Sequence, residues 1–156
     1  MLSDRTMFGA TTRLPRVADV LERAAMIYPD TIEVLPSAHR SAVRCPFRGV
    51  TKLAGLMQSL HDLALNLQRR QGCLGESIHS ALARSGYHYS PNVSPTAAGK
   101  YRSDYTFLVD GKPSLVGGHV TLGAGDANTC MSVHFVLDQH RVRIAWCGRH
   151  RPNTTS

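Results

Sequence analysis

The sequence predicts an α+β fold, in which two to three N-terminal helices pack on a C-terminal four-stranded antiparallel meander. Two observations predict it. Apolar residues recur with a period of about 3.6 in the first half of the chain, whereas apolar and polar residues alternate after residue 101. In addition, the dipeptide Asp110-Gly111 separates two alternating segments and is typical of a tight β-hairpin turn.

The chain of 156 residues has the length of a single domain. We expect a mainly helical half over residues 17–86, a sheet half over 101–150, and flexible ends at 1–14 and 152–156. The polar N-terminal residues do not resemble a secretory signal, and no apolar run approaches the roughly 18 residues of a membrane span. The sequence therefore predicts a cytoplasmic protein with reduced cysteines and no membrane partner.

Three segments carry the helical pattern. The first covers residues 17–28 and ends at Pro29. The second, over residues 50–70, is the longest, and a third, shorter helix is expected over 76–84. The apolar stripe of the second helix follows helical spacing throughout and consists of Leu53, Leu56, Met57, Leu60, Leu63, Ala64 and Leu67.

The segments between these helices are expected to be short or irregular. Residues 31–35 are predicted to form a short strand. Residues 36–47 contain two prolines and several polar side chains, which indicates a loop. Residues 87–100, rich in serine, proline and glycine, are expected to connect the two halves.

Four strands are expected in the second half. Residues 104–109 and 114–122 form the first predicted hairpin, and residues 130–137 and 141–147 form the second. Gly117-Gly118 interrupts the second of these strands and indicates a bulge or a close backbone approach.

Alternation assigns the strand side chains to two faces. One face is apolar and is expected to cover the long helix; it holds Met131, Val133, Phe135, Leu137, Val142, Ile144 and Trp146. The opposite face is expected to be polar and solvated, and it collects His119, Thr121, Ser132, His134, Arg141 and Arg143, with Ala145 and Cys147.

This polar face carries the inventory for metal-independent RNA cleavage. Histidine transfers protons near neutral pH, and arginine stabilises charge on a phosphate. We therefore interpret His119 and His134 as the acid and base and Arg141 and Arg143 as the phosphate stabilisers, with His150 completing the site. An ordinary solvated sheet face without a function is the alternative.

The charge points to a nucleic-acid partner. The net charge is +7, and the basic residues are fifteen arginines and three lysines. Arginine suits phosphate because its planar fork donates two parallel hydrogen bonds. A codon bias toward arginine is the alternative explanation. Candidate nucleic-acid contacts lie in the loop before the long helix, ahead of the first hairpin and after the last strand: Arg40, Arg44, Arg48, Arg102 and Arg149.

Two further sites are considered. Cys130, His134, Cys147 and His150 form a C-x3-H and a C-x2-H pair on neighbouring strands, which zinc could accept. Because this spacing is not that of a zinc finger, buried thiols are the favoured interpretation, and no cofactor is expected. The glycine-rich segment 123–126 is interpreted as a hairpin loop, with an anion-binding nest as the alternative.

Several motifs resemble known proteins. The chain contains R-S-D-Y-T-F-L-V-D-G-K, G-H-V-T-L-G-A-G-D, C-M-S-V-H-F-V-L-D and R-V-R-I-A-W-C-G-R-H in succession, and P-S-A-H-R-S-A-V-R-C-P-F-R further upstream. These resemble a family of uncharacterised small bacterial proteins with an H-x-x-L-G turn, a hydrophobic strand and a final G-R-H, over about residues 17–154. The layout is also similar to RelE-type toxins, the ribosome-dependent ribonucleases of toxin–antitoxin pairs.

The sequence thus predicts an RNA-acting protein, a metal-independent endoribonuclease of toxin type. The toxin resemblance implies ribosome-associated mRNA as substrate and a small acidic antitoxin-like protein as partner. The alternative is a non-enzymatic nucleic-acid-binding or partner-binding protein of a bacterial mobile-element or defence system. A third hypothesis is a structural interaction module whose basic charge reflects genome composition.

Overall fold

The computed structural model describes residues 14–92, 99, 101–138 and 140–150. The ends that the sequence predicts to be flexible lie outside the described residues, apart from Leu14. Among the helices of the described ranges, none combines the length and apolarity that crossing a membrane requires. The α+β class is confirmed, but the sheet is not a four-stranded antiparallel meander.

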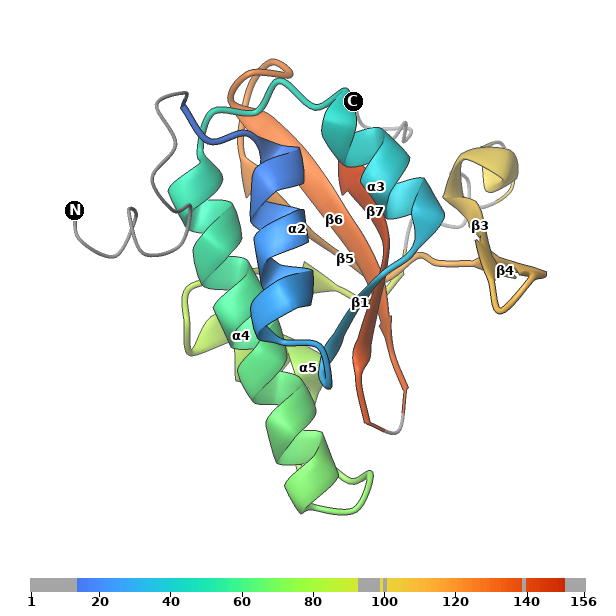
Figure 1. Cartoon of the computed structure of the whole chain (residues 1–156). Helices are drawn as coiled ribbons and strands as arrows, with labels where there is room; N and C mark the ends of the chain where they lie inside the picture. Colours follow the sequence, from blue (N-terminus) through green and yellow to red (C-terminus); the bar gives the residue numbers. More distant parts are fainter. Residues whose placement is uncertain (1–13, 93–98, 100, 139, 151–156) are drawn as a thin grey trace.

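A mixed five-stranded sheet in the order β1-β7-β6-β5-β2 forms the centre of the structure (Figure 1). β1 runs parallel to β7, and every other neighbouring pair is antiparallel. The parallel pair joins segments more than a hundred residues apart, which no local pattern could indicate. The strands are β1 (Ile32–Val34), β2 (Tyr89–Ser90), β5 (His119–Gly123), β6 (Cys130–Leu137) and β7 (Val142–Gly148).

Three of the four α-helices whose bounds lie in the described ranges follow the predicted apolar periodicity: α2 (Val17–Ile27), α4 (Val50–Arg69) and α5 (Ile78–Ala83). They pack against the sheet, and the predicted stripe of α4 is buried in full. The main core contains the stripe from Leu53 to Ala64 together with Val17, Val20, Leu21 and Ala24 of α2 and Val120, Leu122, Met131, Val133, Phe135, Val142 and Ile144 of the sheet.

The prediction of a loop over residues 36–47 is wrong for most of that segment, because residues Pro36–Val43 form the helix α3. Pro36 is the first residue of this helix. The missing N–H of proline costs nothing there, because the first N–H groups of a helix have no acceptor within it, and the fixed φ of proline suits the first turn. Ala38 and Ala42 pack into the core, and the Ser41 hydroxyl accepts a hydrogen bond from the backbone N–H of Cys147 at 2.9 Å. Packing on β7 therefore stabilises a helix whose own sequence is polar.

The first predicted hairpin forms a separate two-stranded sheet. The 3-10 helix η1 (Arg102–Tyr105) leads into β3 (Thr106–Val109), which pairs with β4 (Lys112–Leu115). The predicted turn at Asp110-Gly111 is confirmed, with φ of 53° and 76°.

The second strand of that hairpin breaks after β4 and resumes as β5. The close backbone approach expected near Gly117-Gly118 is confirmed, since a side-chain carbon on Gly118 would lie 2.4 Å from the Tyr89 hydroxyl. Tyr89 belongs to β2, a strand within the segment predicted to be a connecting loop.

An irregularity in the β6–β7 pair exchanges the faces of the last residues of β7. His134 lies opposite Trp146 and Phe135 lies opposite Ile144, so Ala145 is an extra residue in β7. As a result Cys147 faces the main core, whereas Ala145 and Trp146 lie on the opposite face. The sequence-based assignment of Trp146 and Cys147 is therefore wrong, because strict alternation does not allow for a bulge.

Candidate nucleic-acid interface

His119 and His134 lie side by side on neighbouring strands. They are paired in the register of β5 and β6, and their stacked rings have centroids 4.7 Å apart. His119 is half-buried, whereas His134 is only 1% exposed, with the rings of Tyr105 and Phe107 beside it. The sheet thus brings the two predicted acid–base residues together but leaves only one of them partly open to solvent.

A backbone carbonyl fixes the tautomer of each ring. Nδ1 of His119 lies 2.7 Å from the oxygen of Gly117, and Nδ1 of His134 lies 3.0 Å from the oxygen of Val116. Because a carbonyl oxygen can only accept a hydrogen bond, Nδ1 donates in both rings. Nε2 of neutral His119 therefore presents a lone pair, and it makes no hydrogen bond within the described part of the chain.

The face around these histidines is not the solvated surface that alternation predicts. The β3–β4 hairpin covers part of it, where Phe107 and Val116 pack with Leu35 and Ala145 in a small second core. Ser132 is fully buried as well. Alternation alone could not show this, since the covering residues come from a hairpin that the sequence places in the same sheet.

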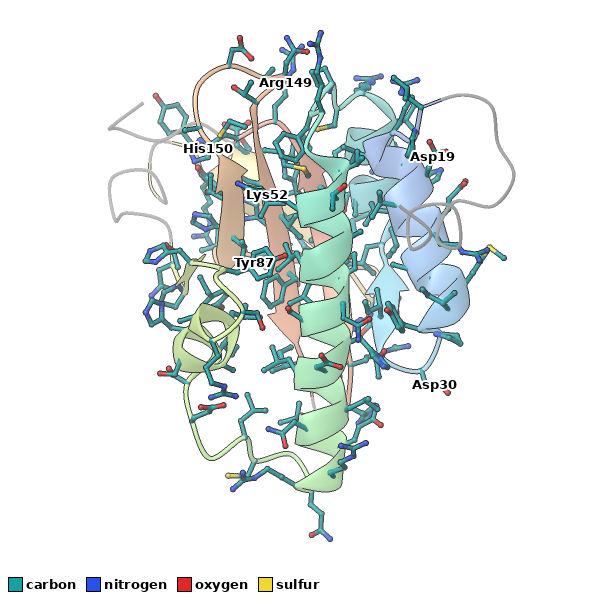
Figure 2. The ribbon with its side chains drawn as sticks, turned by 90° about the vertical axis from the view of Figure 1, so that its left-hand side faces the viewer. Asp19, Asp30, Lys52, Tyr87, Arg149 and His150 are labelled. Carbon is teal, nitrogen blue, oxygen red and sulfur yellow. The ribbon has the colours of Figure 1, made fainter. Side chains whose placement is uncertain are left out.

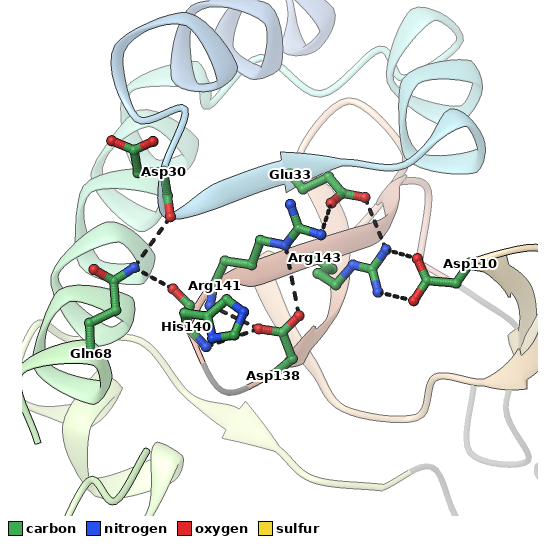
Figure 3. A network of polar contacts seen from close by, with 8 residues as sticks. All are labelled: Asp30, Glu33, Gln68, Asp110, Asp138, His140, Arg141 and Arg143. Carbon is green, nitrogen blue, oxygen red and sulfur yellow. Dashed lines mark hydrogen bonds and ion pairs between the residues drawn. The ribbon is translucent and has the colours of Figure 1, made fainter. Parts of the chain in front are cut away.

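Arg141 and Arg143 are held in a network of carboxylates at the β1 edge of the sheet (Figure 3). Nη2 of Arg141 lies 2.8 Å from Glu33, and Nη2 of Arg143 lies 3.1 Å from the other oxygen of the same carboxylate. Arg143 also donates two hydrogen bonds to Asp110, at 2.7 and 2.5 Å. Its side chain is only 8% exposed, so the structure places its guanidinium on protein carboxylates rather than in an open site.

The same network shifts the pKa of its acidic groups. The hydrogen bond from Arg143 holds the pKa of Asp110 below its usual value. Burial opposes such a shift at Asp138, but hydrogen bonds from the backbone N–H groups of His140 and Arg141 hold its pKa below the usual value too. Hydrogen bonding to Asp110 raises the pKa of Arg143, so this cation stays charged.

The four residues considered for zinc do not converge. Cys147 points into the main core, whereas His134 lies on the opposite face of the sheet. Cys130 pairs with Gly123 at the start of β6, and burial raises the pKa of its thiol. Within the described ranges, no group of three or more His, Cys, Asp or Glu side chains could hold a metal ion.

Exposed cations gather instead where α4 begins. We call Arg16, Arg44, Arg48, Lys52 and Arg149 the basic end. All five are exposed, and none of them forms an ion pair with another described residue. Figure 2 shows Arg149 and Lys52 in this part of the molecule, with Asp30 toward the opposite end of α4.

Two hydrogen bonds to backbone carbonyls link residues of the basic end to neighbouring segments. The N–H of Arg48 donates to the carbonyl of Asn128 at 2.9 Å, and the guanidinium of Arg16 donates to the carbonyl of Val43 at 3.3 Å. Burial raises the pKa of the Cys45 thiol, and the nearby charge of Arg149 works against that shift. These contacts connect the segment between α3 and α4 with the start of α2, with the loop that contains Asn128 and with Arg149 after β7.

The glycine-rich loop beside this surface closes on itself. Asp126 accepts hydrogen bonds from the N–H of Asn128 at 2.8 Å and from the hydroxyl of Thr129 at 3.4 Å. The N–H of Ala124 donates to the carbonyl of Thr129. Its polar groups are therefore largely used within the loop, as expected of a hairpin connection.

The residues predicted to contact nucleic acid lie in different parts of the structure. Arg44, Arg48 and Arg149 belong to the basic end, Arg40 lies one turn earlier on α3, and His150 follows Arg149. Arg102 lies apart, on η1. Sequence reasoning missed Arg16 and Lys52, and the available signal was their position at a helix start, Arg16 as the residue before α2 and Lys52 in the first turn of α4.

No protein family, curated protein or solved structure matches this chain, so the resemblances inferred from its motifs stay predictions.

Proposed function

We propose that this protein binds single-stranded RNA through its basic end. The observation that carries the proposal is the contrast between two sets of cations. Arg141 and Arg143 are held by Glu33, Asp110 and Asp138, whereas the cations of the basic end form no ion pair with any described residue. A phosphate that binds there would displace no carboxylate that is paired with these cations in the described part of the chain.

The local chemistry of this surface supports an anionic ligand. Asp126 is the acidic residue of the adjoining loop, and its carboxylate accepts hydrogen bonds from the loop itself. The first turn of α4 contains no acidic side chain, so the positive end of its dipole adds to the field of Arg48 and Lys52. Four of the five cations are arginines, whose forked donors fit phosphate oxygens.

Binding is tested by the salt dependence of fluorescence anisotropy with a labelled single-stranded RNA of about 16 nucleotides. Five phosphate contacts predict a slope of log K against log salt of about −3.5, since each contact to a single strand contributes about −0.7. The double variant Arg48→Glu, Arg149→Glu is expected to abolish most of the binding and to flatten the slope.

The matched control places the same two substitutions at the other end of α4. Arg69 and Arg70 are exposed there, so Arg69→Glu, Arg70→Glu changes the net charge equally. We expect this control to keep the slope of the natural chain. Absence of binding at about 50 mM salt, or an equal loss in both double variants, would overturn the proposal.

One observation favours a second candidate, metal-independent endoribonuclease activity. The fixed tautomer of His119 leaves Nε2 as a base beside a second histidine. In this candidate Nε2 of His119 takes the 2′-hydroxyl proton, the 2′-oxygen attacks phosphorus and displaces the 5′-oxygen, and the 5′-oxygen takes a proton from water, while the basic end positions the phosphate. RNA cleavage that persists with a chelator and is lost in His119→Ala supports it; intact RNA after incubation with the natural chain rejects it and leaves the binding proposal standing.

A further inference from the structure

A groove of about 730 Å³ separates α3 from the β3–β4 hairpin. Arg40, Val43 and Arg44 line its α3 side, Thr106 and Leu108 line its β3 side, and Trp146 of β7 lies between them. We call it the edge groove. No residue of β4 lines it, so the groove runs along the β3 side of the two-stranded sheet.

On its β3 side this sheet has no neighbouring strand among the described residues. There β3 pairs with β4 alone, and the turn closes on the pair Val109–Lys112. In a two-residue hairpin the pair next to the turn exchanges hydrogen bonds, and every second pair after it does the same. The bond from the N–H of Val116 to the carbonyl of Tyr105, at 2.8 Å, fits that alternation.

It follows that the backbone N–H and C=O of Leu108 point away from β4. Its opposite residue is Pro113, which has no N–H to offer. Within the described part of the chain, the backbone of Leu108 forms no hydrogen bond outside the hairpin ladder. A donor and an acceptor are therefore presented side by side on the edge of β3.

The side chains along the groove combine apolar surface with positive charge. Leu108 is 62% exposed and Val43 is 49% exposed, and they belong to opposite walls. Arg40 and Arg44 are exposed on α3 and form no ion pair with a described residue. A ligand that fills the groove would cover both apolar side chains and neutralise both arginines.

We propose that the edge groove binds an extended, acidic segment of a partner protein, which adds to β3 as a third strand. The backbone of the segment pairs with the N–H and C=O of Leu108, and alternate carboxylates face Arg40 and Arg44. A segment of alternating apolar and acidic residues meets both requirements, because successive side chains of a strand point to opposite faces.

An extended peptide fits this edge better than RNA does. The phosphate oxygens of a nucleic-acid backbone only accept hydrogen bonds, so they satisfy an N–H but are repelled by a neighbouring C=O. A peptide strand supplies both a donor and an acceptor at the right spacing. The proposal therefore concerns a protein partner and does not rest on RNA binding at the basic end.

The probe is a random peptide library displayed on phage and selected on the full chain. We expect the enriched peptides to be acidic with alternating apolar residues. When synthesised, they should change the emission of Trp146, which is the single tryptophan of the sequence and lines the groove. Methylating alternate backbone nitrogens of such a peptide should weaken its binding at least about tenfold if it adds as a strand.

Two matched proline variants separate edge pairing from general destabilisation. Leu108→Pro removes an N–H on the groove edge, whereas Leu115→Pro makes the same change on β4, opposite Thr106 and outside the edge groove. Binding lost in Leu108→Pro and in Arg40→Glu, but kept in Leu115→Pro, supports the proposal. It is overturned if selection yields no peptide that depends on Arg40, if methylated peptides bind equally well, or if Leu108→Pro and Arg40→Glu lose RNA binding but keep the peptides.

Discussion

Arg143 on β7 holds Asp110 at the tip of the β3–β4 hairpin through two hydrogen bonds, from Nη1 to Oδ2 at 2.7 Å and from Nη2 to Oδ1 at 2.5 Å (Figure 3). The same guanidinium reaches Glu33 of β1. One side chain thus links the two-stranded sheet to the parallel edge of the main sheet. This link positions the hairpin over the second face, and with it one wall of the edge groove.

Arg143→Ala should lower the free energy of unfolding by about 1–3 kcal/mol, because it removes three charge-assisted hydrogen bonds of a nearly buried side chain. Urea denaturation followed by Trp146 fluorescence measures the change. Arg69→Ala, at an exposed position of α4, is the control and should stay within about 0.5 kcal/mol of the natural chain. Equal effects of the two substitutions would contradict a structural role of the link.

The acid limb of the stability curve should depend on Asp110. Its pKa is lowered in the folded protein by the hydrogen bond from Arg143. A group with a lowered folded pKa stabilises the protein above its unfolded value, and that contribution is lost as the pH falls through the folded value. We therefore expect the urea concentration at the unfolding midpoint to decrease as the pH drops below about 3.8, the ordinary pKa of this group.

Asp110→Asn isolates this contribution, since the amide cannot ionise. The variant should be less stable than the natural chain at pH 7 but should lose less of its stability on acidification. Asp30→Asn, a change at an exposed residue outside the hairpin, serves as the control for net charge. Parallel pH profiles for the natural chain and Asp110→Asn would reject the assignment.

Two glycines with similar backbone angles should respond very differently to alanine. Gly123 and Gly86 have φ of 73° and 85°. A side-chain carbon on Gly123 would lie 2.0 Å from the carbonyl oxygen of Thr129, whereas the space around Gly86 is open. Gly86→Ala should cost about 1 kcal/mol from backbone strain alone, and Gly123→Ala should cost clearly more.

Gly123→Ala should also weaken RNA binding if the basic end is the interface. The loop after Gly123 carries Asn128, whose carbonyl accepts the N–H of Arg48. Thermal melting and RNA anisotropy on both variants separate the two effects. Equal melting temperatures would show that the close approach at Gly123 relaxes without cost.

The local sequence pattern is sufficient to predict the elements that local interactions stabilise. The stripe from Leu53 to Leu67 predicts α4 because each apolar side chain returns to one face. Asp110-Gly111 predicts its turn because both residues adopt positive φ. The pairing of the histidines likewise follows from their place in two adjacent antiparallel strands.

Tertiary contacts decide what the sequence does not indicate. α3 is polar and is stabilised by contacts with β7, such as the hydrogen bond from Cys147 to Ser41. The strand predicted over residues 31–35 is present as β1, but its parallel partner β7 is distant in the sequence. The extra residue Ala145 reverses the faces after it, which no alternation rule can show. The carboxylates that hold Arg143 come from two other elements, so its sequence pattern alone cannot distinguish an ion pair from a phosphate contact.

The reactivity of the cysteines tests the bulge at Ala145. All four thiols are free, and Cys147 is fully buried in the main core, where burial raises its pKa. Cys73 is exposed in the turn after α4. An increase of one pKa unit lowers the thiolate fraction about tenfold at neutral pH, and burial slows access further.

Under native conditions iodoacetamide should therefore modify Cys73 first and Cys147 last, as measured by mass spectrometry over time. All four should react together in denaturant, which serves as the control. Native labelling of Cys147 as fast as that of Cys73 would place it on the opposite face, as strict alternation requires, and would remove the bulge that turns Trp146 toward the edge groove.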